Sequence, residues 1–339
     1  MHKQQGLSLV ELMISIVLGL ILMTGVMNIF ISSKVVFSTQ QAMSRIQETG
    51  RLAVDFIARD VRMVGYYGGA RKGNNPYAFS IVNAPANDGL NGDFDVSIRG
   101  YDSYEDLAAV TDLGELPGSV TPVEDTSVLV VRAANQQGVV VTQDNTPTSF
   151  FAYTTATAKD SSGCVGNICE GGTVVVSDSI KAHIFKVSTL TLNGSQLIIN
   201  HANSWGGDNT NPLTMFGLGA EILPLNTTVY FLAKGASGTT SLYQKINKGS
   251  ALELLEGVEN MSVTYSSAAN VYQQASATAD WEAVRSAHVE LLVRSLNDNV
   301  LGESQDYEFS GVKYEDVEDR RMRKKFITSV VPRSRMVMN

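Results

Sequence analysis

The chain has 339 residues, of which 44% are hydrophobic and 18% charged, and its formal net charge is −8. An acidic chain of this kind lacks the excess of Lys and Arg that a protein-wide nucleic-acid surface requires, so nucleic acid is not an expected partner. The length leaves room for one long helix and one large globular domain, or two small ones.

The first segment of the chain is its most apolar part. From Leu7 to Ile31 the only charged side chain is Glu11. About 20 apolar residues suffice to cross a bilayer as a helix, and a carboxylate inside such a span costs about 3 kcal/mol. Cleavage after Gly6 would create a free amine with which Glu11 could pair. Lys3, in the short leader that precedes the span, favours a cytoplasmic N-terminus.

Two ordinary interpretations of this segment remain as alternatives. A secretory signal has a shorter apolar core, and Ser32-Ser33-Lys34 only weakly resembles its cleavage site. A single uncut membrane anchor accounts for the apolar run but leaves Glu11 without a role. Neither explains both the length of the run and its acid.

The helix is expected to continue to about residue 64, which gives it a length of about 87 Å. Its second half is amphipathic, because polar residues fill the positions between apolar residues at helical spacing. These apolar residues are Ile46, Ala53, Phe56, Ile57, Val61 and Val64. The stripe predicts packing on a sheet, and Gly65 marks the end of the helix.

The rest of the chain is predicted to be β-rich, with loops and short strands over residues 66–125. The predicted strands are 127–132, 184–192, 196–200, 228–234, 241–246, 258–265, 286–294 and 326–331. Asn193-Gly194 is a strong hairpin signal between two of them. Successive strands without helices between them predict one or two antiparallel sheets, and therefore an α+β fold.

The chain has two cysteines, Cys164 and Cys169. In a translocated domain we expect them to form a local disulfide, which would stabilise the fold by about 2 kcal/mol. A metal site would need further ligands, and no histidine lies nearby in the sequence. The oxygen ligands of a calcium loop are incomplete at 208–211. We therefore expect neither a metal nor a cofactor.

No catalytic motif stands out, so an enzyme is not expected. The chain has no Gly-x-Ser-x-Gly elbow, no phosphate-binding loop and no His-Glu-x-x-His. His183, His201 and His288 are interpreted as structural residues with satisfied hydrogen bonds. The basic run at 320–325 follows an acidic run at 315–319, and we interpret it as a solvated loop before the last strand rather than a DNA contact.

Gly6, Leu7, Glu11 and the apolar helix resemble the N-terminus of type IV pilins. The resemblance implies that prepilin peptidase cleaves after Gly6 and methylates Leu7. It also implies that Glu11 pairs with the N-terminal amine during filament assembly. The usual first mature residue is phenylalanine, so Leu7 departs from the pattern.

Further segments resemble the PilW family of minor pilins. They include Gly50-Arg51, Leu254 to Met261, Trp281 to Arg294, Arg320-Arg321 and Phe326 to Arg333. The resemblance implies a leader at 1–6, a helix at 7–64 with its transmembrane half at 7–31, and a periplasmic or extracellular β-rich domain at 65–339. It also implies a place in the inner membrane and then in the initiating complex at the pilus tip. The implied partners are other minor pilins, the major pilin, prepilin peptidase and a tip adhesin.

Two other functions remain open from the sequence. A type II secretion pseudopilin would have the same N-terminal chemistry, and only the resemblance over 254–294 separates it from a minor pilin. A membrane-anchored periplasmic binding protein or enzyme would instead need a concave polar cluster in the β-rich domain.

Overall fold

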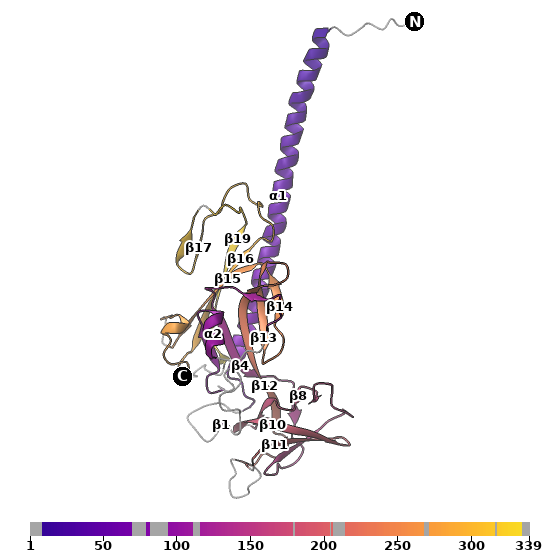
Figure 1. Cartoon of the computed structure of the whole chain (residues 1–339), viewed down its shortest axis with the longest axis vertical. Helices are drawn as coiled ribbons and strands as arrows, with labels where there is room; N and C mark the ends of the chain where they lie inside the picture. Colours follow the sequence, from indigo (N-terminus) through magenta and orange to yellow (C-terminus); the bar gives the residue numbers. More distant parts are fainter. Residues whose placement is uncertain are drawn as a thin grey trace, which may run out of the picture.

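The computed structural model (Figure 1) describes residues 9–69, 79–81, 94–110, 116–178, 180–203, 205, 214–267, 271–315 and 317–333. One long helix, α1 (Leu9–Met63), projects from a β-rich head. Its 55 residues correspond to a length of about 82 Å. The predicted α+β fold with a long N-terminal helix is confirmed.

The two halves of α1 have different surroundings. In the first half, the apolar side chains from Leu9 to Ile31 are exposed, and the most apolar window of the helix has no buried residue. In the second half, the buried residues recur at helical spacing and form the predicted apolar stripe. They are Ile46, Gly50, Ala53, Ile57, Ala58 and Val61. At the end of the helix, Gly65 has a φ of 70°, and its N–H donates to the carbonyl of Arg132.

The strands that share a core with α1 form what we call the helix-proximal region. They are β2 (Ile98–Tyr101), β4 (Val128–Ala134), β13 (Thr240–Ile246), β14 (Leu252–Glu256), β15 (Val258–Ser266), β16 (Ser286–Arg294), β19 (Arg323–Val330) and the C-terminal half of β12 (Glu221–Lys234). The helix packs against β4, β14, β16 and β19. Strands β15, β16 and β19 form a three-stranded sheet in that order. A single hydrophobic core joins these strands to the buried stripe of α1.

The strands on the other side of β12 form what we call the distal region, which lies at the end of the head away from the projecting helix (Figure 1). They are β1 (Phe79–Ile81), β5 (Val139–Val140), β6 (Ser149–Tyr153), β7 (Cys164–Val165), β8 (Ile168–Cys169), β9 (Thr173–Ser177), β10 (Ala182–Asn193) and β11 (Gln196–His201). Most of their buried side chains belong to clusters separate from the core around α1.

Strand β12 connects the two regions. Its N-terminal part, Glu221 to Pro224, pairs with β9, while Thr228 to Lys234 pairs with β13. The result is one 12-stranded sheet that runs through both regions. Among the described pairings, all are antiparallel except that of β1 with β10, which is parallel and therefore departs from the all-antiparallel prediction.

The remaining elements are short. They are α2 (Tyr104–Val110), β3 (Thr121–Pro122), the 3₁₀ turn η2 (Ala275–Ala277), β17 (Tyr307–Phe309) and β18 (Val312–Tyr314). The hairpin β17–β18 is held to the three-stranded sheet through Ser310, whose hydroxyl lies 3.1 Å from that of Ser262 and whose N–H donates to Glu290.

The predicted strands are largely confirmed, including the hairpin around Asn193-Gly194, which is β10 and β11. The predicted start of the last strand at Phe326 is wrong, because β19 begins at Arg323. The sequence analysis also missed α2, β6 and β9.

Candidate assembly interface

Glu11 is placed in the first turns of α1, whereas Gly6 and Leu7 lie outside the described residues. The nearby Ser15 hydroxyl donates to the backbone carbonyl of Glu11, not to its carboxylate. Within the described part of the chain, the carboxylate has no ion pair. A carboxylate in apolar surroundings is costly unless a cation offsets its charge, so a partner must come from outside these residues.

The apolar surface around Glu11 extends along the helix for about the length needed to cross a bilayer. Large apolar side chains are exposed continuously from Leu9 to Ile31. An exposed apolar surface of this extent marks a membrane or a protein contact. By length and composition α1 qualifies as a membrane-spanning helix. This surface is therefore suited to lipid and to the helices of other subunits.

The head holds the second half of α1 by specific contacts. The carboxylate of Asp60 accepts hydrogen bonds from the Tyr230 hydroxyl at 2.7 Å and the Gln244 amide at 3.4 Å. Burial, followed by the charge of Asp60, raises the pKa of Tyr230, so its hydroxyl remains a proton donor. Gly50 lies directly against the ring of Phe326, where a Cβ would collide with it. These contacts couple the direction of the helix to the sheets.

A buried charge cluster stabilises the sheet that carries Phe326. The Arg323 side chain is 3% exposed and bonds to Glu259 at 2.7 Å and to Asp319 at 2.6 Å. Arg294 also pairs with Glu259, at 3.0 Å. The hydrogen bond from Arg323 is the largest influence on Asp319 and holds its carboxyl pKa at about 2. Burial opposes the charge of Arg323, but its two acidic partners outweigh it and raise its pKa.

This cluster corrects the sequence interpretation of the basic run at 320–325. Arg323 is buried within the sheet rather than solvated in a loop. Asp319 does neutralise it, as the interpretation expected, but the Arg323 side chain lies inside the fold at 3% exposed, while that of Asp319 is 29% exposed. The strand starts three residues earlier than predicted.

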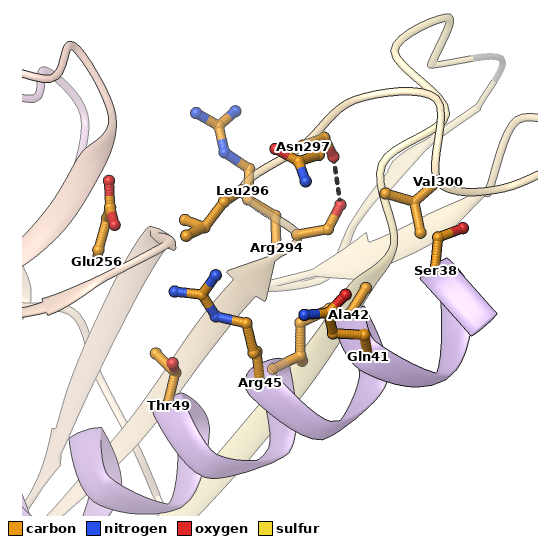
Figure 2. A pocket seen from close by; sticks show the side chains of 12 residues that line it. Ser38, Gln41, Ala42, Arg45, Thr49, Glu256, Arg294, Leu296, Asn297 and Val300 are labelled. Carbon is orange, nitrogen blue, oxygen red and sulfur yellow. Dashed lines mark hydrogen bonds between the residues drawn. The ribbon is translucent and has the colours of Figure 1, made fainter. Parts of the chain in front are cut away.

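A hollow of about 110 Å³ lies between α1 and the head. Figure 2 shows Arg45 extending from the helix toward the side on which Glu256 lies. At its rim the Thr39 hydroxyl donates to the carbonyl of Val300. The Ser295 hydroxyl donates to a carbonyl, that of Asn297, and not to a base. The Ser295 hydroxyl is therefore not paired with a base in this arrangement.

The predicted disulfide between Cys164 and Cys169 is confirmed and closes the small β7–β8 hairpin of the distal region. Among the described residues there is no group of three or more His, Cys, Asp or Glu that could hold a metal ion. The weak calcium pattern at 208–211 lies outside the described residues.

The histidine prediction is partly wrong. His288 has a hydrogen-bond contact with the hydroxyl of Ser329, at 2.8 Å. His183 and His201 are buried beside Trp205. Neither Nδ1 of His183 nor Nε2 of His201 has a hydrogen-bond partner among the described residues. Burial, followed by the charge of Lys181, lowers the pKa of His183 to about 4. Both rings are therefore neutral members of an aromatic core.

The remaining rings of this core are Phe150, Phe185 and Phe216. The sequence analysis did not identify the cluster. Its only local signal is the two-residue spacing of His183 and Phe185, which places both side chains on one face of β10.

The exposed apolar helix with one acid, joined to a largely antiparallel head, is consistent with an α+β pilin-like fold. Two family models match the chain: the prokaryotic N-terminal methylation motif over residues 1–27 and type IV pilus-assembly protein W (PilW) over residues 229–333. Together they support a PilW-like minor pilin involved in type IV pilus assembly. No curated protein and no solved structure matches the chain.

The assembly role implies contacts with other pilins and with prepilin peptidase, and the N-terminal motif and apolar helix indicate a membrane-anchored pilin. The PilW match is to a structural pilus-assembly protein. Its 229–333 range begins within β12 and ends just after β19, so it covers much of the helix-proximal region and none of β5 to β11.

Proposed function

We propose that this chain is a minor pilin of the initiating complex at the pilus tip. Prepilin peptidase cleaves it between Gly6 and Leu7 and methylates Leu7. Glu11 then pairs with the N-terminal amine of a neighbouring subunit. The observation that carries this proposal is the Glu11 carboxylate, which has no ion pair among the described residues, on a helix whose first half exposes its apolar side chains.

Before assembly the helix holds the chain in the inner membrane, with the N-terminus in the cytoplasm and the head in the periplasm. Lys3 on the cytoplasmic side fits the distribution of basic residues around membrane spans. The disulfide between Cys164 and Cys169 fits an oxidising compartment for the head.

The energetic reason for assembly lies in the same carboxylate. In the apolar phase an uncompensated charge costs several kcal/mol, and a neighbouring amine offsets that cost. The cost disappears when the N-terminal amine of the next subunit meets Glu11. The other minor pilins, the major pilin and a tip adhesin are the partners of this complex, and nucleic acid is not.

The test compares Glu11→Ala with Ser15→Ala, a control one turn further along the same exposed helix. Each full-length variant is produced in a strain that lacks the native gene, and membranes and sheared pili are analysed separately. Glu11→Ala should remain in the membrane but fall at least about tenfold in sheared pili and in pilus number, because about 1.4 kcal/mol changes a binding constant tenfold. Ser15→Ala should behave as wild type.

Normal pilus number together with normal recovery of Glu11→Ala in sheared pili would contradict the proposal. Deletion of the gene separates the two filament systems. Loss of twitching supports the minor pilin, whereas loss of exoprotein release with normal twitching would assign the chain to type II secretion.

A further inference from the structure

Strand β19 is an edge of the three-stranded sheet, because β16 is its only strand partner among the described residues. One face of the strand lies on the helix, where Phe326 meets Gly50. On the other face Lys325 pairs with Glu290. The helix covers the first face, and Lys325 on the second face is engaged in an ion pair within the chain, whereas the outer backbone edge has no strand partner in the described part of the chain.

The direction of each backbone group along β19 follows from contacts at its first residues. The carbonyl of Met322 accepts from the N–H of Ser295, on the β16 side. The N–H of Arg323 donates to the side-chain oxygen of Gln305 at 2.8 Å, and its carbonyl accepts from the Gln305 amide at 3.0 Å. In an antiparallel strand the N–H and C=O of one residue point to the same side, and successive residues alternate.

Lys325, Ile327 and Ser329 therefore point their backbone donors and acceptors to the free edge. None of these groups has a backbone partner among the described residues. Ile327 is also 51% exposed. Gln305 satisfies the first position of the edge as a neighbouring strand would, and the following positions stay open.

Unpaired edges are sites where another strand can add. We propose that the free edge of β19 pairs with an edge strand of a different pilin subunit, so that the three-stranded sheet continues across the subunit boundary. This inference rests on the proposed place of the chain in a pilin complex. Backbone hydrogen bonds supply the attraction, and the side chains beside the edge select the partner.

The charge of the edge favours an acidic partner strand. Lys324 is exposed and has no ion pair among the described residues, and Arg333 is exposed just beyond the strand. The strand itself contains no acid. Two copies of β19 would bring like charges together, which is unfavourable. A strand with Asp or Glu beside Lys324 fits this surface.

The first experiment places a photoreactive amino acid at Ile327 of the full-length chain in piliated cells. The control position is Leu218, which is 80% exposed near the distal strands. Irradiation should join position 327 to another pilin, identified by mass spectrometry, whereas position 218 should not give this product. No adduct at 327, or an adduct with a second copy of this chain, would overturn the proposal.

Two variants separate the contribution of the backbone N–H of residue 327 from that of its side chain. Ile327→Pro removes one outward N–H, and proline is tolerated on edge strands. Ile327→Ala shortens the side chain but retains the N–H. Recovery in sheared pili should fall about tenfold for Ile327→Pro and stay near wild type for Ile327→Ala. Equal recovery of both would contradict strand pairing, with protease resistance of membrane-bound Ile327→Pro confirming its fold.

Recovery in sheared pili also separates a failure of this inference from a failure of the proposed function. If the chain is not a filament subunit, even the wild type will be absent from sheared pili. If only the strand pairing is wrong, the wild type and Ile327→Pro will be recovered equally.

Discussion

The helix-proximal and distal regions share one sheet but are organised around different interactions. In the proximal region the strands enclose the amphipathic half of α1, and the buried charges around Arg323 are paired. In the distal region the core holds a disulfide-closed hairpin and a cluster of rings in which His183 and His201 each have a nitrogen without a hydrogen-bond partner in the described part of the chain. The PilW match lies mainly in the first region.

This difference shows which part of the head is constrained by its contacts with α1. Side chains that face α1 must fit its surface, as Phe326 fits Gly50, and must fix its direction, as Tyr230 does through Asp60. The distal strands do not have this constraint. Two tryptophans allow the regions to be followed separately: Trp281 packs on Tyr265 in the proximal core, and Trp205 lies among the distal rings.

The largest expected effect on stability follows from disruption of the buried charge cluster. Arg323→Met should lower the free energy of unfolding of the proximal region by about 3 kcal/mol, because Glu259 and Asp319 lose the Arg323 guanidinium and keep only Arg294 and Arg321 as ion-pair partners. Denaturant unfolding of detergent-solubilised full-length protein, followed through Trp281 in a Trp205→Phe background, measures this change. Arg285→Met is the control, because Arg285 is exposed. An equal effect of both variants would contradict the assignment.

As the pH falls, the distal region should be the first part of the head to lose stability. The pKa of His183 is lowered from 6.5 to about 4 in the fold, so the unfolded state binds more protons between these values. Stability is complete above pH 6.5 and falls as the pH drops toward 4, by about 2 kcal/mol between pH 7 and pH 5. Unfolding followed through Trp205 in a Trp281→Phe background checks this. His183→Phe should flatten the dependence, and an unchanged slope would exclude His183 as its source.

Removal of the disulfide should also act locally. Cys164→Ser with Cys169→Ser should cost about 2 kcal/mol by the loop-entropy relation. Unfolding followed through Trp205 should shift, and unfolding followed through Trp281 should not. Equal shifts at both tryptophans would show that the two regions unfold as one unit, which would remove the distinction drawn here.

The smallest expected effect concerns the contact between helix and sheet. Gly50→Ala should destabilise the proximal region by about 1 kcal/mol, because the clash with Phe326 exceeds the gain in helix propensity. Gly25→Ala is the control, since nothing lies within 4 Å of a Cβ added there. The Trp281 signal measures both variants, and a stabilised Gly50→Ala would contradict close packing at this point.

Much of the proximal region could be predicted from the sequence because its signals are local. The helical stripe from Ile46 to Val61 acts through nearest neighbours, and so does a local signal of the distal region, the turn at Asn193-Gly194; both predictions hold. The start of β19 could not be predicted in this way, since Arg323 in the strand is neutralised by Glu259, 64 residues earlier, as well as by the nearby Asp319. This long-range ion pair lets a polar residue of the basic run lie inside the strand.

The distal region was harder to predict for a similar reason. The N-terminal half of β12 contains Pro224, which lacks a backbone donor and disfavours a long central strand. The ring cluster brings together residues from Phe150 to Phe216, a separation that no local pattern reveals. Of the candidate site, Glu11 was recognised from its isolation in an apolar run, whereas the free edge of β19 depends on the sheet order.

The most direct test of a filament role is the mass of the intact N-terminus. The protein should be purified from a host that has its prepilin peptidase. The account predicts a chain that begins at Leu7 and is one methyl group heavier than the unmodified sequence. A chain that still begins at Met1, or is cut near Ser33, would contradict it and would make this an ordinary anchored or secreted domain.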